Sequence, residues 1–398
     1  MGQIQIEDPK NERRHDPCLA GIRGYGFLLV FCAHYFRPDL LAKPGTLRLK
    51  LLSIPASPAV FAVPAFFVLS GYLIGGILYH TRNREGFFRV FYIRRVLRVF
   101  PVYYLTLLAI AAFYVSEHVP MDFQFWSHFL YIQNLLPDPT PRAGASVVMG
   151  HFWSLAVEEQ FYLIWPFVVW RFRDRRKLIT VVIALIIACC LFRLAAPMLS
   201  ISAPKLGSFT PTRADAILMG VLLSLVCEST LYCRLVPMAK WATLVGIITA
   251  ALLSFYKGAP WAFTSAGKEV AIPLANVTAV AIVVAVMEQG SLLNRLCSQR
   301  WVCWLGALSY SLYIFHLTFS NFFIYYLTPR FDAHMRHSLA LLASSALAFC
   351  TTLGLSVLSY RLIEGPIMTF KRHIKYGAAR AHVVSQEIGE PALMSAGD

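Results

Sequence analysis

The chain has 398 residues, of which 57% are hydrophobic and only 14% are charged. Soluble domains carry about 25% charged residues, so this composition excludes an ordinary soluble protein. The formal net charge is +15, from 36 Lys and Arg against 21 Asp and Glu. Because the basic residues fall between apolar stretches, they indicate orientation in a membrane. We therefore expect a lipid bilayer, and no nucleic acid, as a partner.

Apolar stretches long enough to cross a bilayer recur between residues 18 and 365. They show no alternation of polar and apolar residues, which excludes a transmembrane β-barrel and favours helices. The predicted fold class is all-α, a polytopic membrane protein with about ten transmembrane helices. The predicted spans are 18–36, 58–79, 99–116, 152–170, 178–199, 212–229, 241–256, 269–287, 304–328 and 338–362.

The distribution of basic residues predicts the orientation of these spans. The connections on the N-terminal side hold 22 Lys and Arg, and the opposite connections hold 10. Because cytoplasmic connections carry the excess of Lys and Arg, both termini are predicted to be cytoplasmic. The chain then divides into a segment 1–17 without a signal-peptide core, a membrane domain 18–370 and a polar cytoplasmic tail 371–398.

Several kinds of site lack their sequence motifs. The nine cysteines form no CxxC pair and lie mostly in apolar segments, so we expect neither a disulfide framework nor a metal site. The sequence has no GxxxxGK[ST] or GxGxxG loop, which disfavours an ATP-driven pump. It also has no G-x-S-x-G nucleophile motif and no HExxH motif.

An apolar and aromatic stretch at 123–136 is only 14 residues long. This length is too short for a transmembrane helix. We predict a short interfacial or re-entrant helix on the outer side of the membrane.

Two ionisable residues, Arg23 and His34, lie in the first span. Eleven positions at 100° place them on one helix face, about 16 Å apart along the axis. Ionisable groups inside a membrane are costly, which favours a functional role. The alternative is an arginine that contacts lipid phosphates and a histidine hydrogen-bonded inside the bundle. His34 and Asp39 also have the H-x4-D spacing of soluble glycerolipid acyltransferases, but so short a match carries little weight.

A basic cluster, Arg94, Arg95 and Arg98, precedes Pro101, which is expected to mark the start of the third span. Arg94 and Arg98 are four residues apart and share a helix face. From there they could grip a phosphorylated ligand through charge-assisted hydrogen bonds. The alternative interpretation is the ordinary basic signal that sets membrane orientation.

The segment HFWSLAVEEQFYLIWP, residues 151–166, brings His151, Glu158 and Glu159 into the outer start of a membrane helix. Two adjacent carboxylates entering a bilayer are hard to explain by packing. They either pair with an arginine or the helix N-terminus, or they orient or protonate a catalytic imidazole.

Three further polar residues lie at or within predicted spans. Arg213 and Asp215 stand at a helix entrance and are expected to form an anchoring ion pair. His316 lies in the middle of an aromatic-rich span, where we expect a hydrogen-bonded core histidine.

Taken in order, these segments resemble the acyltransferase-3 family of integral-membrane O-acyltransferases, which modify bacterial surface polysaccharides, lipo-oligosaccharides and some antibiotics. The resemblance spans residues 18–370 and supports a fold of ten helices with both termini cytoplasmic. It is carried by the R-x10-H spacing of Arg23 and His34, FFVLSGYLIGG (66–76), RRVLRVFPVYY (94–104), QN (133–134), HFWSLAVEEQFYLIWP, RADAILMG, LGALSYSLYIFH and SYRLIEGP.

The resemblance implies transfer of an acyl group, usually acetyl, from cytosolic acyl-CoA to a hydroxyl of an acceptor. It implies that His34 is the essential histidine, as general base or transient acyl carrier, with Arg23 as its partner on the same face. We expect Glu158 or Glu159 to orient the His34 ring. The other residues expected at the donor site, besides Arg23, are Arg94, Arg95, Arg98, Trp153 and Ser154.

The acceptor implied is a saccharide, such as a surface polysaccharide, a lipid-linked sugar or a lipo-oligosaccharide, reached from the bacterial inner membrane. Two alternatives stay open: an O-acyltransferase of a macrolide-like secondary metabolite, and a secondary transporter or exporter of a glycoconjugate. A transporter is expected to show two related halves with interrupted helices, and the sequence shows no such symmetry.

Overall fold

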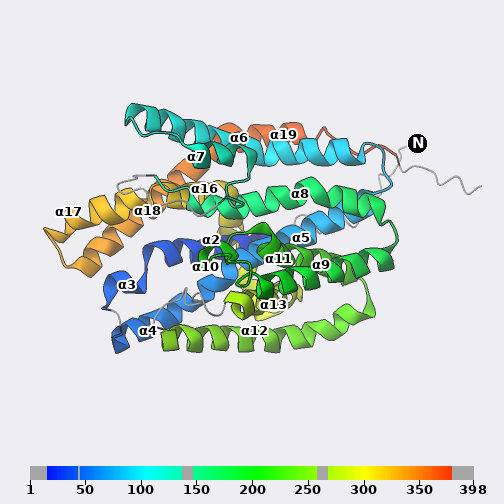
Figure 1. Cartoon of the computed structure of the whole chain (residues 1–398), viewed down its shortest axis with the longest axis horizontal. Helices are drawn as coiled ribbons and strands as arrows, with labels where there is room; N and C mark the ends of the chain where they lie inside the picture. The colour runs from blue at the N-terminus through cyan, green and yellow to red at the C-terminus, as the bar shows by residue number, and fades with distance from the viewer. Residues whose placement is uncertain (1–15, 44, 137–146, 258–267, 379–398) are drawn as a thin grey trace, which may run out of the picture.

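The computed structural model describes residues 16–43, 45–136, 147–257 and 268–378. These residues form a helical bundle, and no β-strand occurs among them. Figure 1 shows long helices running roughly side by side, with α6 and α19 along one edge of the molecule and α12 along the other. The all-α fold class is confirmed. The ends of the chain, 1–15 and 379–398, lie outside the described residues, so the predicted terminal segments are described only in part.

The helices follow one another along the chain. In chain order they are α2 (Pro17–Tyr35), α3 (Pro38–Leu41), α4 (Leu47–Ala56), η2 (Ser57–Phe61), α5 (Ala62–Thr81), α6 (Phe87–Ser116), α7 (Phe123–Ser127), η3 (His128–Leu130), η4 (Gly150–Phe152), α8 (Trp153–Arg171), α9 (Arg175–Ala195), α10 (Ala203–Leu206), α11 (Thr210–Val226), α12 (Thr230–Lys257), α13 (Lys268–Met287), α14 (Leu292–Cys297), α15 (Arg300–Ala307), α16 (Ser309–Thr318), η5 (Phe322–Leu327), α17 (Thr328–Asp332), α18 (His337–Ser359), η6 (Tyr360–Glu364) and α19 (Gly365–Lys371).

Seven helical segments in the described residues are long and apolar enough to cross a membrane. Three other predicted spans also contain helix, but in forms that depart from a long apolar rod. Helix α8 carries two carboxylates, α11 has 17 residues, and the span 304–328 is divided among α15, α16 and η5. The count of ten and the cytoplasmic placement of both termini stay predictions.

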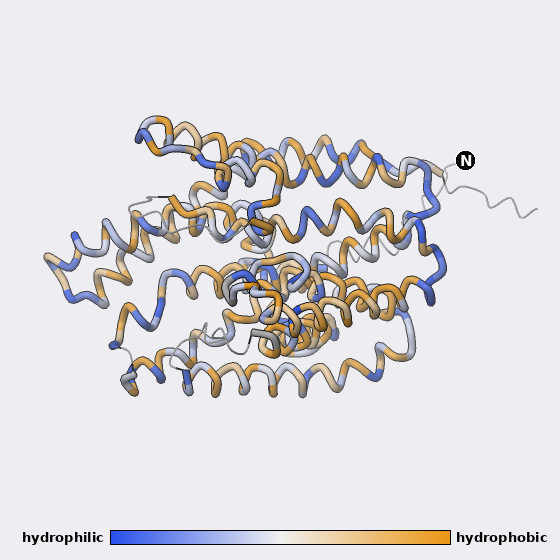
Figure 2. Tube along the Cα trace, viewed as in Figure 1, coloured by the Kyte–Doolittle hydropathy of each residue, from blue (hydrophilic) through white to orange (hydrophobic). Residues whose placement is uncertain are grey.

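The outer faces of the bundle are apolar. Figure 2 shows hydrophobic residues along the long helices and hydrophilic residues at connections such as the one between α8 and α9. Helix α9 exposes Ile187 and Leu191, and α12 exposes Leu244 and Leu252. Such surfaces are stable against lipid chains and not against water, so the structure supports a multi-pass membrane protein.

The third predicted span begins earlier than expected. Helix α6 starts after Gly86 and runs through Pro101, so the basic cluster lies inside the helix and not in a connection before it. Proline removes one backbone hydrogen bond, but its fixed φ is compatible with a helix. The Tyr310 hydroxyl donates to the Val99 carbonyl at 2.6 Å, which adds a contact between α16 and this part of α6.

The stretch 123–136 is helical only over α7 and η3, and its last residues turn back into the bundle. The expected interfacial helix is therefore shorter than predicted. Tyr131 takes a left-handed conformation with φ of 54°, and Gln133 and Asn134 are buried. The Gln160 amide of α8 donates to the Tyr131 carbonyl at 2.6 Å and to the Asn134 side chain at 2.8 Å. These bonds supply hydrogen-bond partners for the polar groups of the turn, which buried polar groups require.

Glycines allow the central helices to touch backbone to backbone. A Cβ on Gly71 of α5 would stand 1.8 Å from the Ile217 carbonyl oxygen of α11, and one on Gly220 would stand 2.0 Å from the Val68 carbonyl oxygen. A similar contact holds α2, where a Cβ on Gly24 would lie 2.3 Å from the Val302 carbonyl oxygen. Small residues let membrane helices approach closely, and here they position α2 and α5.

The ion pair predicted for Arg213 and Asp215 is formed with a different arginine. Asp215 lies 2.6 Å from Arg193, and both side chains are completely buried. Arg193 also donates to the Thr212 carbonyl at 2.6 Å. The Arg213 guanidinium instead lies over the ring of Trp153, 5.5 Å from its centre. Residues two apart in a helix point in different directions, which explains why Arg213 and Asp215 do not pair.

We predict that Gly71→Ala lowers the melting temperature in detergent by several degrees, because overpacking of a tight contact costs about 1–3 kcal/mol. Gly76→Ala on the same helix is the matched control, since its nearest neighbour would be the Ser224 Cβ at 3.8 Å. Thermal unfolding of the two variants tests the contact. Equal melting temperatures would show that α5 and α11 are not in backbone contact.

Candidate functional site

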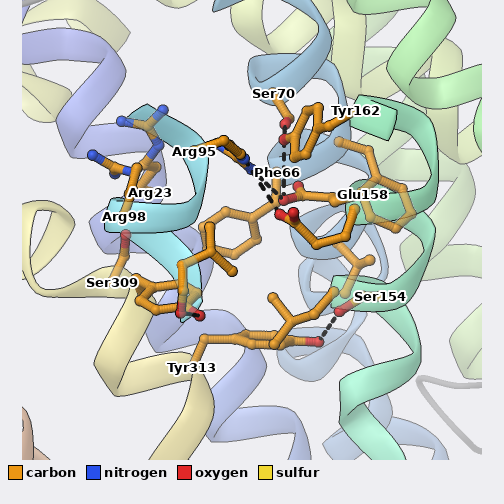
Figure 3. Close-up of a pocket in the computed structure, with 16 residues that line it drawn as sticks. Arg23, Phe66, Ser70, Arg95, Arg98, Ser154, Glu158, Tyr162, Ser309 and Tyr313 are labelled. Atoms are coloured by element: carbon orange, nitrogen blue, oxygen red, sulfur yellow. Dashed lines mark hydrogen bonds and ion pairs between the residues drawn. The ribbon is translucent and has the colours of Figure 1, made fainter. Parts of the chain in front are cut away.

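A polar cavity opens between α2, α5, α6, α8 and α16, with about 780 Å³ of space free of atoms. Figure 3 shows its side chains converging from these helices. It contains three of the arginines and both carboxylates that the sequence singles out. The lining residues are Arg23, Val63, Phe66, Phe67, Ser70, Arg95, Arg98, Val99, Ser154, Leu155, Glu158, Glu159, Tyr162, Ser309, Tyr310 and Tyr313. We call this the arginine cavity.

Arg95 compensates both carboxylates of α8. Its Nε lies 3.3 Å from Glu159 Oε1, and its Nη2 lies 3.6 Å from Glu158 Oε2. The guanidinium also lies 3.6 Å from the centre of the Tyr162 ring. The Tyr162 hydroxyl donates to Glu158 at 3.2 Å and is hydrogen-bonded to Ser70. One arginine, one tyrosine and one serine thus hold two adjacent negative charges inside the bundle.

Arg23 and Arg98 are held differently. Among the residues that the structure describes, no hydrogen bond or ion pair engages either guanidinium. Figure 3 shows the two groups together on one side of the cavity, away from the carboxylates that Arg95 contacts. Neighbouring positive charges repel one another, and an anion bound between them offsets this repulsion. The pair is therefore suited to a phosphate or another anionic group.

The expected donor-site residues separate into two groups. Arg23, Arg95, Arg98 and Ser154 line the arginine cavity. Arg94 does not, because its Nε donates to the Ile374 carbonyl at 2.7 Å after the end of α19. Trp153 does not line it either, although its neighbour Ser154 does, since adjacent helix residues point to different sides.

A second cavity lies beyond the first, toward the opposite end of α2. It contains His34 and has about 1470 Å³ of space free of atoms. Its polar lining includes Arg37 and Asp39, which lie in the segment after α2. These two residues form an ion pair, in which Arg37 Nε lies 3.2 Å from Asp39 Oδ1. We call it the histidine cavity. Its lining residues are Val30, Ala33, His34, Arg37, Pro38, Asp39, Ala59, Val63, Gly150, His151, Trp153, Tyr313 and Leu317.

Val63 and Tyr313 line both cavities and so form the partition between them. The Tyr313 hydroxyl is hydrogen-bonded to the Ser154 hydroxyl at 2.6 Å and donates to the His151 carbonyl at 3.1 Å. Arg23 lines one cavity and His34 lines the other, so the two residues lie on opposite sides of this partition. This arrangement agrees with the sequence-based geometry in which both residues occupy one face of α2.

His34 has histidines as neighbours, and not the carboxylates expected beside it. Its Nδ1 is hydrogen-bonded to the Val30 carbonyl at 2.8 Å, and its ring centre lies 5.2 Å from that of His316. Glu158 and Glu159 line the arginine cavity and contact Arg95. The structure therefore places His316 next to the His34 ring, and not Glu158 or Glu159, which we expected to orient it. The two carboxylates follow His151 by about two helical turns, so they lie further along the helix axis and reach the other cavity.

Sequence reasoning does not assign His151 and His316 to the site. It predicts a core histidine at position 316, and it places His151 only within its segment. Both are buried, and their ring centres are 5.1 Å apart. The one signal available in the sequence is that His34, His151 and His316 all stand in apolar helical surroundings, where an ionisable group is rare.

Residues 16–361 match the model of the acyltransferase-3 family, which is described as an acyltransferase domain. The peptidoglycan O-acetyltransferase OatA of Listeria monocytogenes is 25% identical over 385 residues, which cover 89% of this chain and 56% of that protein. No solved structure matches.

Two other relatives give the same picture. The putative peptidoglycan O-acetyltransferase YrhL of Bacillus subtilis is 27% identical over 76% of this chain and 48% of its own length. The O-acetyltransferase OatA of Staphylococcus aureus is 26% identical over 78% of this chain and 53% of its own. The chain therefore spans about half the length of the curated relatives that it matches.

We predict that Arg95→Gln destabilises the protein by about 3 kcal/mol, because it leaves two partly buried carboxylates without a cation. Thermal unfolding in detergent measures the loss. Arg89→Gln, at an exposed position of the same helix, is the matched control and leaves the melting temperature unchanged. A wild-type melting temperature for Arg95→Gln would show that Glu158 and Glu159 do not depend on this arginine.

Proposed function

The chain belongs to the acyltransferase-3 family, and we propose that it is a membrane O-acyltransferase that moves an acetyl group from acetyl-CoA to a hydroxyl of a saccharide acceptor. The observation that carries the proposal is the pair of cavities on one helix face. One cavity contains two arginines without hydrogen bonds or ion pairs in the described chain, and the other contains His34.

The arginine cavity suits the donor. Coenzyme A carries phosphates, and Arg23 and Arg98 supply guanidinium groups that can bind them through charge-assisted hydrogen bonds. Arg23 lies near the end of α2 that is predicted to face the cytoplasm, where acyl-CoA is made. The donor would then enter from the cytoplasmic side.

The distance between the cavities suits the length of the donor. Arg23 and His34 are separated by about 16 Å along α2, a length comparable to the extended pantetheine arm of coenzyme A. Phosphates held at the arginines would place the thioester near the partition formed by Val63 and Tyr313. Movement of these two side chains would admit the thioester to His34.

His34 supplies the chemistry. Its Nδ1 is hydrogen-bonded to a carbonyl, which only accepts hydrogen bonds, so Nδ1 carries the hydrogen and Nε2 is the basic nitrogen. As general base, it takes the proton of the acceptor hydroxyl while the oxygen bonds to the acyl carbon. The C–S bond then breaks, and the coenzyme A thiolate takes up the proton. As a transient carrier, Nε2 would bond to the acyl carbon while the C–S bond breaks and the coenzyme A thiolate leaves; the hydroxyl oxygen would then take the acyl group from Nε2, and the thiolate would take up the hydroxyl proton.

The histidine cavity suits a saccharide. Arg37 and Asp39 provide hydrogen-bonding groups for hydroxyls, and Trp153 provides an aromatic surface against which a sugar ring can pack. The names of the Listeria and Bacillus relatives assign peptidoglycan, a saccharide polymer, as their acceptor. For this chain we propose a surface polysaccharide or a lipid-linked sugar at the outer side of a bacterial inner membrane.

We predict that His34→Ala lowers acetyl transfer by at least about 100-fold, because it removes the general base. The assay incubates purified protein with radiolabelled acetyl-CoA and membrane extract, and follows both the label in saccharide and the released thiol. Binding of coenzyme A stays near the wild-type level, because His34 does not line the arginine cavity.

Each outcome of this assay decides between functions. Label in saccharide with wild type only supports acyl transfer through His34. Wild-type transfer by His34→Ala would remove His34 from its role. A folded wild-type protein that neither binds nor consumes acetyl-CoA or longer acyl-CoA would contradict the proposed function and favour a transporter.

We predict that Arg98→Gln raises the KM for acetyl-CoA about tenfold or more, because a hydrogen bond to a charged group contributes about 1.5–3 kcal/mol. The melting temperature does not fall, since the variant removes a positive charge that has no ion pair in the described chain and lies beside Arg23. Steady-state kinetics and thermal unfolding are measured together. A lower melting temperature with an unchanged KM would assign Arg98 a structural role instead.

A further inference from the structure

Three histidines from three separate elements meet beside the histidine cavity. His316 of α16 is completely buried and lies between the other two. Its ring centre is 5.2 Å from that of His34 on α2 and 5.1 Å from that of His151 on η4. At these separations, ring nitrogens can interact directly or through one water molecule.

Backbone carbonyls determine which nitrogen of each ring carries hydrogen. His316 Nδ1 lies 2.7 Å from the Tyr313 carbonyl, and His151 Nε2 lies 3.0 Å from the Ile314 carbonyl. A carbonyl oxygen only accepts, so in the neutral rings these nitrogens are protonated. The opposite nitrogens, His316 Nε2 and His151 Nδ1, then present lone pairs.

These lone pairs are unsatisfied. His316 Nε2 and His151 Nδ1 are both buried and have no hydrogen-bond partner in the described part of the chain. A buried polar atom without a partner costs free energy and is uncommon in native proteins. Two such atoms in one cluster, beside the proposed general base, indicate that the site needs a group that can accept a hydrogen bond or a proton.

Neither metal binding nor aromatic packing explains why these three histidines lie together. No group of three His, Cys, Asp or Glu side chains in the described residues is placed to hold a metal ion. Aromatic packing explains a ring at position 316, since Phe27 meets it edge to face at 6.1 Å. Packing alone would be served equally by phenylalanine and does not explain two buried lone pairs.

We propose that His316 is a positioning residue that acts through His34, by receiving a hydrogen bond from the His34 imidazolium and sharing the proton that His34 takes from the acceptor. The proposal rests on the proposed function and extends it. Once His34 Nε2 holds the proton, the His34 imidazolium can donate toward the His316 Nε2 lone pair, directly or through one water molecule.

The shared proton has a definite role in the reaction. The acceptor releases its proton at His34, and the coenzyme A thiolate takes one up after the C–S bond breaks, so the overall reaction releases none. The proton must therefore be held while the acyl group moves. A second imidazole that accepts a hydrogen bond stabilises the imidazolium during this interval.

The test uses two variants of one position in full-length protein. His316→Phe keeps a ring of similar size but removes the lone pair, and we expect kcat to fall about 10- to 100-fold, the range for loss of a hydrogen bond to a charged group, while the KM for acetyl-CoA stays unchanged. His316→Gln restores an oxygen that accepts a hydrogen bond, and we expect it to recover part of kcat. A role in packing alone would instead give a normal kcat in His316→Phe or an impaired kcat in both variants.

His128→Phe is the matched control, because His128 is also buried and bonded to a carbonyl, at 2.9 Å from that of Gln124, but its ring meets Phe152 at 6.3 Å between centres and not His34 or His316. We expect it to keep wild-type kcat, and an equal fall would overturn the specific role of His316. Wild-type and His34→Ala proteins distinguish failure of this inference from failure of the proposed function. Transfer by wild type, loss in His34→Ala and a normal kcat in His316→Phe would overturn the inference and leave the proposed function standing. No transfer by wild type would overturn both.

A spectroscopic measurement tests the cluster without activity. In wild-type protein with ¹⁵N-labelled histidine, the signal that disappears in His316→Gln belongs to His316. We expect a neutral ring protonated at Nδ1, with Nε2 bare and shifted when His34 is replaced by alanine. A His316 ring protonated at Nε2, or one insensitive to His34→Ala, would overturn the proposal.

Discussion

A charge inside a helical membrane bundle must be matched by a neighbour or by a ligand, because lipid offers neither water nor counterions. Arg95 meets this constraint for two residues at once by contacting Glu158 and Glu159. From its position on α6 it pairs with both carboxylates, so neither pairs with another arginine in the described residues. Arg23 and Arg98 consequently have no acidic partner within hydrogen-bonding distance in the described residues, which leaves their charges for the anionic donor that we propose.

The same helices divide the interior into two chemical environments. The arginine cavity is charged and suits phosphates, whereas the histidine cavity combines imidazole, an ion pair and an aromatic face. Val63 and Tyr313 stand between them. Under the proposed function, this arrangement allows the donor and the acceptor to approach one reacting centre from opposite sides. The backbone contacts at Gly24 and Gly71 keep α2 and α5 in place around it.

Much of this protein could be predicted from its sequence. Length and hydropathy predict helices, because a backbone in lipid must satisfy its own hydrogen bonds. The spacing of Arg23 and His34 predicts one helix face, because it depends only on helix geometry. The predictions failed where partners come from elsewhere in the chain. Asp215 pairs with Arg193, and Arg94 bonds to the Ile374 carbonyl. The helix start predicted at Pro101 was wrong for a local reason, because the fixed φ of proline is compatible with the interior of α6.

The sequence by itself determined the membrane class, the helical fold and the polar residues that are candidates for function, since each of these follows from composition or from spacing within one helix. Only the tertiary structure decided which charges are paired, that Glu158 and Glu159 belong to Arg95, and that His316 and His151 lie beside His34. The physical reason is that helix geometry is local. Ion pairs and histidine contacts depend instead on how α2, α6, α8 and α16 pack, and that packing joins residues far apart in the chain.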